Sequence, residues 1–182
     1  GQTLAVLPDL GAAGAEAAIA AAKGALSPAS DARQRAEWLR AIAAELQREK
    51  HELARIITQE QGKPLKESVV EVEYSAGFFT FFAGALEHLR PKSIAERPRG
   101  MNWAVHHRPS GVVALITPWN FPLAMLAKKL APALAAGCAV VVKPADLTPL
   151  TSVALWHLLE RIGLPPGLAN LVVGRPAAIG QV

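Results

Sequence analysis

Cysteine is almost absent from this sequence: among 182 residues there is one, Cys138. A chain with a single cysteine cannot build a disulfide framework. The first residues lack the basic-then-apolar layout of a signal peptide, and no apolar run approaches the roughly 20 residues that cross a bilayer. These absences predict a protein of a reducing compartment, the cytoplasm, with no membrane partner.

Aromatic residues are also scarce, at 5% of the chain. The net charge of +4 comes from scattered Lys and Arg residues that do not interleave with aromatics as a nucleic-acid surface requires. His106 and His107 are adjacent, so on a strand they would point to opposite faces and could not chelate one ion. We therefore expect a solvated, mildly basic exterior, no nucleic-acid partner and no metal.

The hydrophobic content of 51% is enough for a real core in a chain of this length. The first half predicts helices: an alanine-rich one over 12–25 that Ser27 and Pro28 close, one from the N-cap Asp31 to the Gln-Gly-Lys-Pro sequence at 61–64, and one from Pro64 to Arg90. In the second of these, apolar residues recur on one face, which we expect to enter the core: Trp38, Ile42, Leu46, Leu53 and Ile57.

Residues 91–110 interrupt this pattern with three prolines and one alternating stretch, "NWAVHHR", which predicts a strand or hairpin outside the core. Strands and helices then alternate, with strands over 112–116, 139–143 and 168–173 and helices over 123–136 and 150–162. This order predicts an α/β fold: a Rossmann-like, doubly wound parallel sheet with flanking helices, preceded by N-terminal helices. We divide the chain into a helical part (1–90), a strand excursion (91–110) and a Rossmann-like part (111–182).

Ligands of such sheets bind at the carboxyl ends of the strands, which carry "TPWN", "KPAD" and "VGRP" here. Lys143 and Asp146 would suit a ribose, because the ammonium donates to one hydroxyl and the carboxylate accepts from another. An exposed lysine followed by an N-cap aspartate explains the same letters equally well. The glycine fingerprint GxGxxG is absent, which counts against a standard dinucleotide fold.

Asn120 stands where the first of these strands ends, between Pro118 and Pro122. An asparagine near proline commonly closes an Asx-turn. The flanking prolines limit backbone freedom, however, and Trp119 and Phe121 can exclude water. A rigid amide donor in a dry site can stabilise a developing oxyanion.

The segment "ITPWNFPLAMLAKKLAPALAAGCAVVVKPADLTPLT" resembles the central signature of the NAD(P)-dependent aldehyde dehydrogenase superfamily, and "ITQEQGKPLKES" and "GLPPGLANLVVGRPAAIG" resemble its flanking segments. The resemblance extends over nearly the whole chain. It implies that Asn120 is the oxyanion-hole amide and that Lys143 and Asp146 hold the adenosine ribose. The remaining cofactor-binding residues that it implies are Ile116, Thr117, Pro118, Trp119 and Ala145, with Asn120 beside them.

In this family the pyrophosphate sits differently from the GxGxxG arrangement, which removes that objection. A carboxylate at position 146 would repel a 2′-phosphate, so NAD is expected, with NADP as the alternative cofactor. "PLAMLAKKLAPALAAGC" is most similar to members that oxidise succinate semialdehyde, in which an arginine that contacts the substrate carboxylate occupies the position of Lys128. An unrelated aliphatic or aromatic aldehyde stays open as the substrate, and a helix-surface cation stays open as the role of Lys128. The excursion at 91–110 resembles the segment with which the family builds a homodimer or homotetramer.

The resemblance implies oxidation of an aldehyde, such as succinate semialdehyde, to the acid through a cysteine thiohemiacetal. The family's nucleophilic cysteine and general-base glutamate lie downstream of this region, and neither appears before Val182. Cys138 is interpreted as a small core residue. We therefore expect the N-terminal part of an enzyme. Two alternatives stay open: a noncatalytic nucleotide-binding or oligomer-forming module, and a CoA-acylating aldehyde dehydrogenase.

Overall fold

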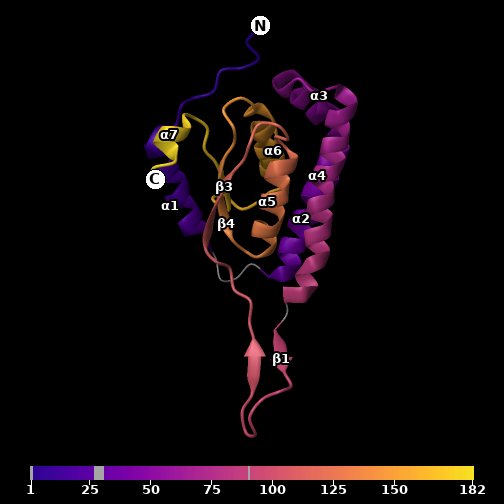
Figure 1. The fold of residues 1–182 in the computed structure, drawn as a ribbon, viewed down its shortest axis with the longest axis vertical. Coiled ribbons are helices and arrows are strands. Elements are labelled where there is room, and N and C mark those ends of the chain that lie inside the picture. The colour runs from indigo at the N-terminus through magenta and orange to yellow at the C-terminus, as the bar shows by residue number, and fades with distance from the viewer. Residues whose placement is uncertain (1, 27–30, 90) are drawn as a thin grey trace.

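The computed structural model describes residues 2–26, 31–89 and 91–182, which form layers around a three-stranded parallel sheet (Figure 1). The sheet has the order β3 (Val112–Ile116), β4 (Ala139–Lys143), β5 (Ala169–Leu171). One face carries α1 (Gly11–Ala25) and α7 (Pro176–Ile179), and the other carries α5 (Ala124–Ala135) and α6 (Leu150–Arg161). An outer layer of α2 (Ala32–Arg48), α3 (Lys50–Gln61) and α4 (Leu65–Ala85) covers α5 and α6. The predicted α/β class with a parallel sheet and flanking helices is confirmed.

The valines of β4 explain why the sheet is covered on both faces. Val140 and Val142 are fully buried in the main core, and Val141 also packs against a small cluster under α1 and α7 that contains Ala15 and Val172. Alternate side chains of a strand point to opposite faces, so three consecutive valines require helices on both sides. The parallel register pairs Ile116 with Lys143, which brings the carboxyl ends of β3 and β4 side by side.

The second predicted helix is in fact two helices. The chain leaves the helical path at Glu49, which ends α2 and begins α3. The expected core face is largely correct, because Ile42, Leu46, Leu53 and Ile57 are buried, whereas Trp38 is only half-buried against the core. The apolar spacing does not reveal the break. α2 buries its apolar residues against α4 and α5, and α3 buries its own against α4 and α6, so the apolar pattern continues across the bend.

The other predicted boundaries need smaller corrections. The third helix ends at Ala85 rather than Arg90, and a 3-10 turn, η1 (Leu86–Leu89), follows it. Arg90, Ser27 and Pro28 lie outside the described residues. The strand predicted over 168–173 is shorter, over Ala169–Leu171.

Residues 91–110 form an antiparallel hairpin of β1 (Lys92–Ile94) and β2 (Trp103–Val105), in which Ile94 pairs with Trp103. The hairpin projects away from the layers, and all six strand residues are exposed (Figure 1). The predicted strand or hairpin is therefore confirmed. Its part in an oligomer, and the division of the chain at 90 and 110, stay predictions.

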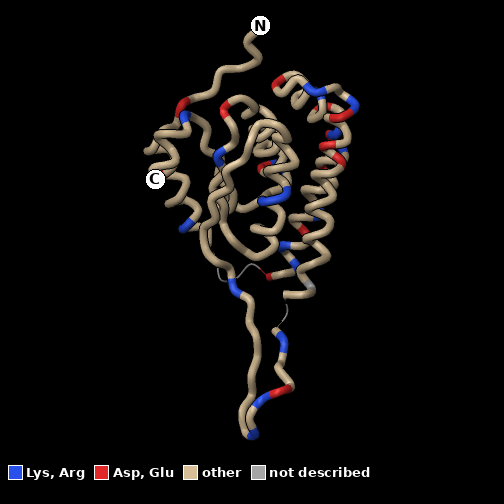
Figure 2. Tube along the Cα trace, in the orientation of Figure 1, with Lys and Arg blue, Asp and Glu red and all other residues tan. Residues whose placement is uncertain are grey.

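Charge is spread over the molecule rather than gathered. Figure 2 shows basic and acidic residues mixed along the outer helices, with basic positions also on the hairpin. Among the described residues, no helix is both long enough and apolar enough to span a bilayer.

Candidate functional site

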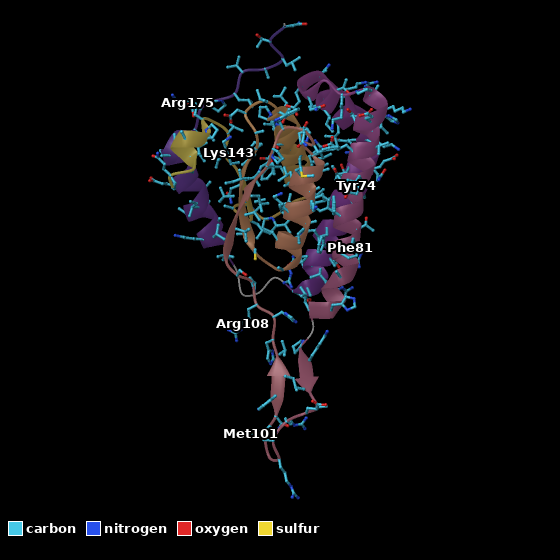
Figure 3. All side chains as sticks on the ribbon, in the orientation of Figure 1. Tyr74, Phe81, Met101, Arg108, Lys143 and Arg175 are labelled. Carbon is cyan, nitrogen blue, oxygen red and sulfur yellow. The ribbon has the colours of Figure 1, made fainter. Side chains whose placement is uncertain are left out.

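The loops that follow β3 and β4 are joined by two hydrogen bonds. The Thr117 amide donates to the Lys143 carbonyl (3.2 Å), and the Thr148 hydroxyl donates to the Trp119 carbonyl (3.4 Å). Figure 3 shows Lys143 at this end of the sheet, near Arg175, and Met101 on the hairpin at the far end of the molecule. The structure therefore brings the two predicted motifs, "TPWN" and "KPAD", together at one edge of the sheet.

Lys143 and Asp146 are in contact. The Lys143 ammonium lies 2.5 Å from the Asp146 carboxylate and 2.6 Å from the Pro144 carbonyl. The lysine side chain is 10% exposed and the aspartate 44% exposed. A carboxylate has about four lone-pair sites, and the ammonium uses one of them. The exposed Asp146 carboxylate therefore keeps acceptor positions for a ligand hydroxyl.

The alternative in which Asp146 caps the next helix is wrong. The first amides of α6, on Leu150 and Thr151, donate to the Glu60 carboxylate on α3 (2.6 and 2.9 Å), and the Thr151 hydroxyl also bonds to it. Burial raises the pKa of Glu60, and the nearby Glu71 carboxylate raises it further, against the lowering effect of these hydrogen bonds. The cap of α6 is therefore Glu60, a carboxylate from the outer helical layer, and not Asp146.

A cavity of about 240 Å³ lies beside the Lys143–Asp146 pair. Ligand pockets usually measure about 300–1,000 Å³, so this cavity suits one end of a dinucleotide rather than the whole. A ribose fits the chemistry of the polar groups here: the Asp146 carboxylate faces the cavity and is paired with the buried Lys143 ammonium, and the Asp9–Arg175 pair and apolar walls complete the lining. The lining residues are Leu7, Pro8, Asp9, Pro144, Ala145, Asp146, Pro149, Val173, Gly174 and Arg175.

One side of this cavity is closed by a segment far away in the sequence. Asp9 accepts from the Arg175 side chain (2.7 Å) and amide (3.2 Å), and the guanidinium holds the pKa of the Asp9 carboxyl below its usual value. Gly174 has φ +136°, and a Cβ there would lie 2.3 Å from the Asp9 carboxylate. Glycine is therefore required at this close approach.

The predicted cofactor wall is an open apolar surface at the end of β3. Ile116 is 68% exposed and Trp119 is 50% exposed, whereas Thr117 is buried. Pro118 and Asn120 are also exposed. Large apolar side chains grouped at the carboxyl end of a strand mark a surface that another group covers.

Asn120 does not form the Asx-turn. Its side chain is exposed and makes no hydrogen bond within the part of the chain that the structure describes. The backbone around it is held at three consecutive carbonyls: Trp119 by Thr148, Asn120 by the Lys63 ammonium (2.9 Å), and Phe121 by the Met125 amide (3.0 Å). A fixed backbone with an unused amide is the geometry that a preorganised oxyanion donor requires.

Sequence reasoning missed the residues that hold this loop. Lys63 was interpreted only as part of a helix end, yet its side chain is 8% exposed and pairs with Glu71, which is 1% exposed. One signal was available: Glu71 falls on the helix stripe that also contains Ser68, Val72 and Ser75, and this stripe is buried. A carboxylate on a buried stripe indicates a partner elsewhere in the fold.

Cys138 lies apart from these groups. Cys138 is 3% exposed in the core, which confirms the interpretation of it as a core residue. It precedes β4, at the opposite edge of the sheet from Asn120. Lys128 is exposed on α5, and its contact with a substrate stays a prediction. Within the described ranges, no group of three or more His, Cys, Asp and Glu side chains could hold a metal ion.

The fold and the placement of these polar groups are those of α/β proteins that bind nucleotides at the carboxyl ends of parallel strands. The model of the aldehyde dehydrogenase family matches residues 1–182, and the chain belongs to this family.

Its relatives include several aldehyde dehydrogenases. The chain is 42% identical to the 3-sulfolactaldehyde dehydrogenase of Pseudomonas putida and 42% identical to the succinate-semialdehyde dehydrogenase (NADP(+)) of Escherichia coli strain K12. Each alignment covers 100% of this chain and 38% of the relative. The chain therefore spans little more than a third of the length of these proteins.

Solved structures agree with this likeness. A crystal structure of an E. coli NADP-dependent enzyme has a TM-score of 0.95 at 42% identity, over 99% of this chain and 38% of that one. Betaine aldehyde dehydrogenase from Staphylococcus aureus in complex with NAD+ has a TM-score of 0.94 at 34% identity, over 98% and 36% of the two chains.

Proposed function

We propose that the complete gene product oxidises an aldehyde to the corresponding acid with NAD(P)+ and water, and that residues 1–182 supply the oxyanion donor and part of the cofactor site. The single observation that carries the proposal is the Asn120 amide. It is exposed and free of hydrogen bonds within the described residues, and its backbone is held on a strand end that is bonded to the Lys143 loop.

The role of Asn120 follows from the charge that develops on the substrate. When a thiolate attacks an aldehyde carbon, the carbonyl oxygen becomes an oxyanion. An amide N–H already aimed at that oxygen stabilises the charge without first having to reorganise, and removing one such donor typically costs about 10²–10³ in rate. The thiolate would come from a part of the protein other than residues 1–182, because Cys138 is buried at the other edge of the sheet.

The cofactor residues are proposed to form two groups, one that binds the ribose and one that lies along the rest of the cofactor. Asp146 and Lys143 would bind the ribose hydroxyls, with Ala145 in the wall of the adjacent cavity. Ile116, Thr117, Pro118 and Trp119 would lie along the cofactor and exclude water from it. The bound nicotinamide supplies the hydride acceptor. Because the Asp146 carboxylate would repel a 2′-phosphate, NAD is the proposed cofactor, in contrast to the NADP(+) named for the E. coli relative.

The proposed substrate carries a second, anionic group. Three relatives are named for succinate semialdehyde, glutarate semialdehyde and 3-sulfolactaldehyde, each an aldehyde with a carboxylate or sulfonate. Lys128 is exposed on α5, about one turn from the start of the helix that follows Asn120, and would supply the cation for that group.

The projecting hairpin is proposed to join copies of the protein in a dimer or tetramer. A two-stranded hairpin with every strand residue exposed is marginally stable by itself, and its unpaired edges and exposed Ile94, Trp103 and Val105 favour a covering partner. Light scattering on the complete gene product should give the mass of two or four copies. A monomer across the working concentration range would contradict this.

One assay tests the proposed function. The complete gene product is offered succinate and glutarate semialdehydes and neutral aldehydes of equal length, with NAD or NADP, and formation of reduced cofactor and of free acid is followed. We expect the highest kcat/KM with a semialdehyde and NAD. Absence of aldehyde-dependent NADH with every substrate would overturn the function, and a higher kcat/KM with NADP would overturn the cofactor assignment. Formation of a thioester only when CoA is present would indicate a CoA-acylating enzyme instead.

A further inference from the structure

Lys63 is a buried cation in the turn between α3 and α4. Its ammonium lies 2.5 Å from the Glu71 carboxylate and 2.9 Å from the Asn120 carbonyl, and 4.0 Å from the centre of the Phe121 ring. Lysine is almost never buried unless it is paired, because a desolvated ammonium is costly. All three contacts therefore serve to hold a charge that the fold has placed beside the "PWNF" loop.

Glu71 divides its carboxylate between this lysine and the helix that follows Asn120. One oxygen binds Lys63, and the other accepts from the Leu123 and Ala124 amides (2.9 and 3.1 Å), the first amides of α5. α5 has no side-chain cap of its own. A carboxylate at a helix N-terminus satisfies amides that have no partner within the helix and interacts favourably with the helix dipole.

This arrangement explains why the Asn120 amide is not engaged. Asparagine close to the start of a helix ordinarily bonds to the first free amides. Here Glu71 already binds them, so the Asn120 side chain is not drawn into capping. Lys63 meanwhile fixes the Asn120 carbonyl, which sets the direction of the residue's backbone.

We propose that Lys63 and Glu71 are positioning residues for Asn120: the glutamate keeps the amide out of helix capping, and the lysine fixes the backbone that aims it at the substrate oxygen. This inference rests on the proposed function of Asn120 as the oxyanion donor. It differs from a general structural role, in which the pair would only dock α3 and α4 against α5. In that case its loss would reduce activity by the same factor whether or not Asn120 was present.

A double-mutant cycle separates the two roles. In the complete gene product, kcat and NAD affinity are measured for Lys63→Met, for Asn120→Ala and for the combination. We expect Lys63→Met to lower kcat by about 10- to 10²-fold, since a small misplacement of a catalytic group has that effect. In the Asn120→Ala background the same change should cost less than about threefold, because residues that act as a unit are not additive.

Two further variants keep the test sound. Lys63→Met leaves the Glu71 charge buried without its partner, so Lys63→Met/Glu71→Gln is made as well; its glutamine oxygen still accepts the α5 amides, and no unpaired charge remains. This variant should fold, bind NAD as the parent does, and show the same dependence on Asn120. Lys50→Met is the matched control. It breaks the Lys50–Glu73 ion pair between α3 and α4 (2.7 Å), which is more exposed than Lys63–Glu71, and should leave kcat within about twofold.

Equal losses of kcat in the Asn120 and Asn120→Ala backgrounds would overturn the positioning role, as would no loss in either. Crystal structures of the parent and of Lys63→Met/Glu71→Gln provide a readout that does not depend on activity. Because the Asn120 carbonyl has lost the Lys63 ammonium in this variant while the α5 amides keep their acceptor, we expect the Asn120 backbone to shift and its side chain to occupy several rotamers. If the parent oxidises no aldehyde, the proposed function fails, while an unchanged Asn120 in these structures would separately overturn the positioning role.

Discussion

Asparagine side chains, such as that of Asn120, usually form hydrogen bonds with nearby backbone groups. Here other residues form these hydrogen bonds: Glu71 accepts from the amides of α5, and Lys63 and Thr148 donate to the loop carbonyls. The side chain is left exposed on a fixed backbone. A buried ion pair and an asparagine at a strand end separately indicate only good packing; together they support the proposed role of Asn120 as a hydrogen-bond donor to a ligand.

Lys128 carries the proposed substrate specificity, and its substitution gives a residue-scale prediction. Lys128→Gln removes the cation, so KM for succinate semialdehyde should rise about five- to tenfold, which corresponds to about 1 kcal/mol for one partly solvated charge contact. KM for a neutral aldehyde of the same length should stay unchanged. Steady-state kinetics with both substrates measures this.

The matched control for this prediction is Lys129→Gln, which removes a neighbouring charge on the same helix. If KM for both aldehydes rose equally, or if Lys129→Gln had the same effect, Lys128 would not be the group that recognises the anion. The proposal would then be confined to aldehyde oxidation without this specificity.

At the scale of elements, the outer helices do more than cover the sheet. Glu60 on α3 and Glu71 on α4 cap α6 and α5, the two helices that follow the strands carrying the site. Each cap comes from a residue at least 52 positions away, so the start of each helix depends on the outer layer being in place. The position of the strand-end loops is thus coupled to the packing of α3 and α4.

Glu60 gives a stability prediction at this scale. Glu60→Ala leaves two α6 amides and the Thr151 hydroxyl without their acceptor, and should lower the free energy of unfolding by about 1–2 kcal/mol. Glu60→Gln keeps an acceptor oxygen and should cost less. Denaturant unfolding of the complete gene product measures both changes, with Glu52→Ala, an exposed α3 carboxylate paired with Arg55, as the control.

The raised pKa of Glu60 adds a pH dependence to this prediction. Between the unfolded and the higher folded pKa, the folded protein binds the proton more tightly, so the contribution of Glu60 to stability falls as pH rises through that interval. Glutamine does not titrate, and the stability of Glu60→Gln relative to the parent should therefore improve from acid toward neutral pH. A relative stability that worsened over the same interval would contradict the assignment of burial as the dominant cause.

At the scale of the whole molecule, the sequence predicted the helices, the strands and the parallel sheet, which follow from local patterns, and missed the contacts between residues far apart in the chain. Alternating strands and helices predicted the parallel sheet, and the strand-end letters predicted which loops meet, since both follow from local pattern and the handedness of the crossovers. Lys63 and Asn120 are 57 residues apart, and Glu60 and Leu150 are 90 apart. The spacing of apolar residues along the chain does not reveal such contacts, because they form only when the outer helices pack on α5 and α6.

The same reasoning explains why the two alternatives drawn from local chemistry were wrong. An Asx-turn at Asn120 and a cap at Asp146 are what each residue does when its surroundings offer nothing better. Here carboxylates from the outer layer bind the first amides of both helices. Because these distant carboxylates cap the helices, neither Asn120 nor Asp146 is used as a cap.

The most direct test is the rate of aldehyde oxidation by Asn120→Ala in the complete gene product, measured together with NAD affinity and thermal stability. The side chain is exposed and makes no hydrogen bond within the described residues, so stability should stay within about 0.5 kcal/mol of the parent. We predict a fall in kcat of about 10²–10³ with NAD affinity nearly unchanged. A variant that lost NAD affinity in the same proportion as kcat would show that Asn120 is structural and that the central claim is wrong.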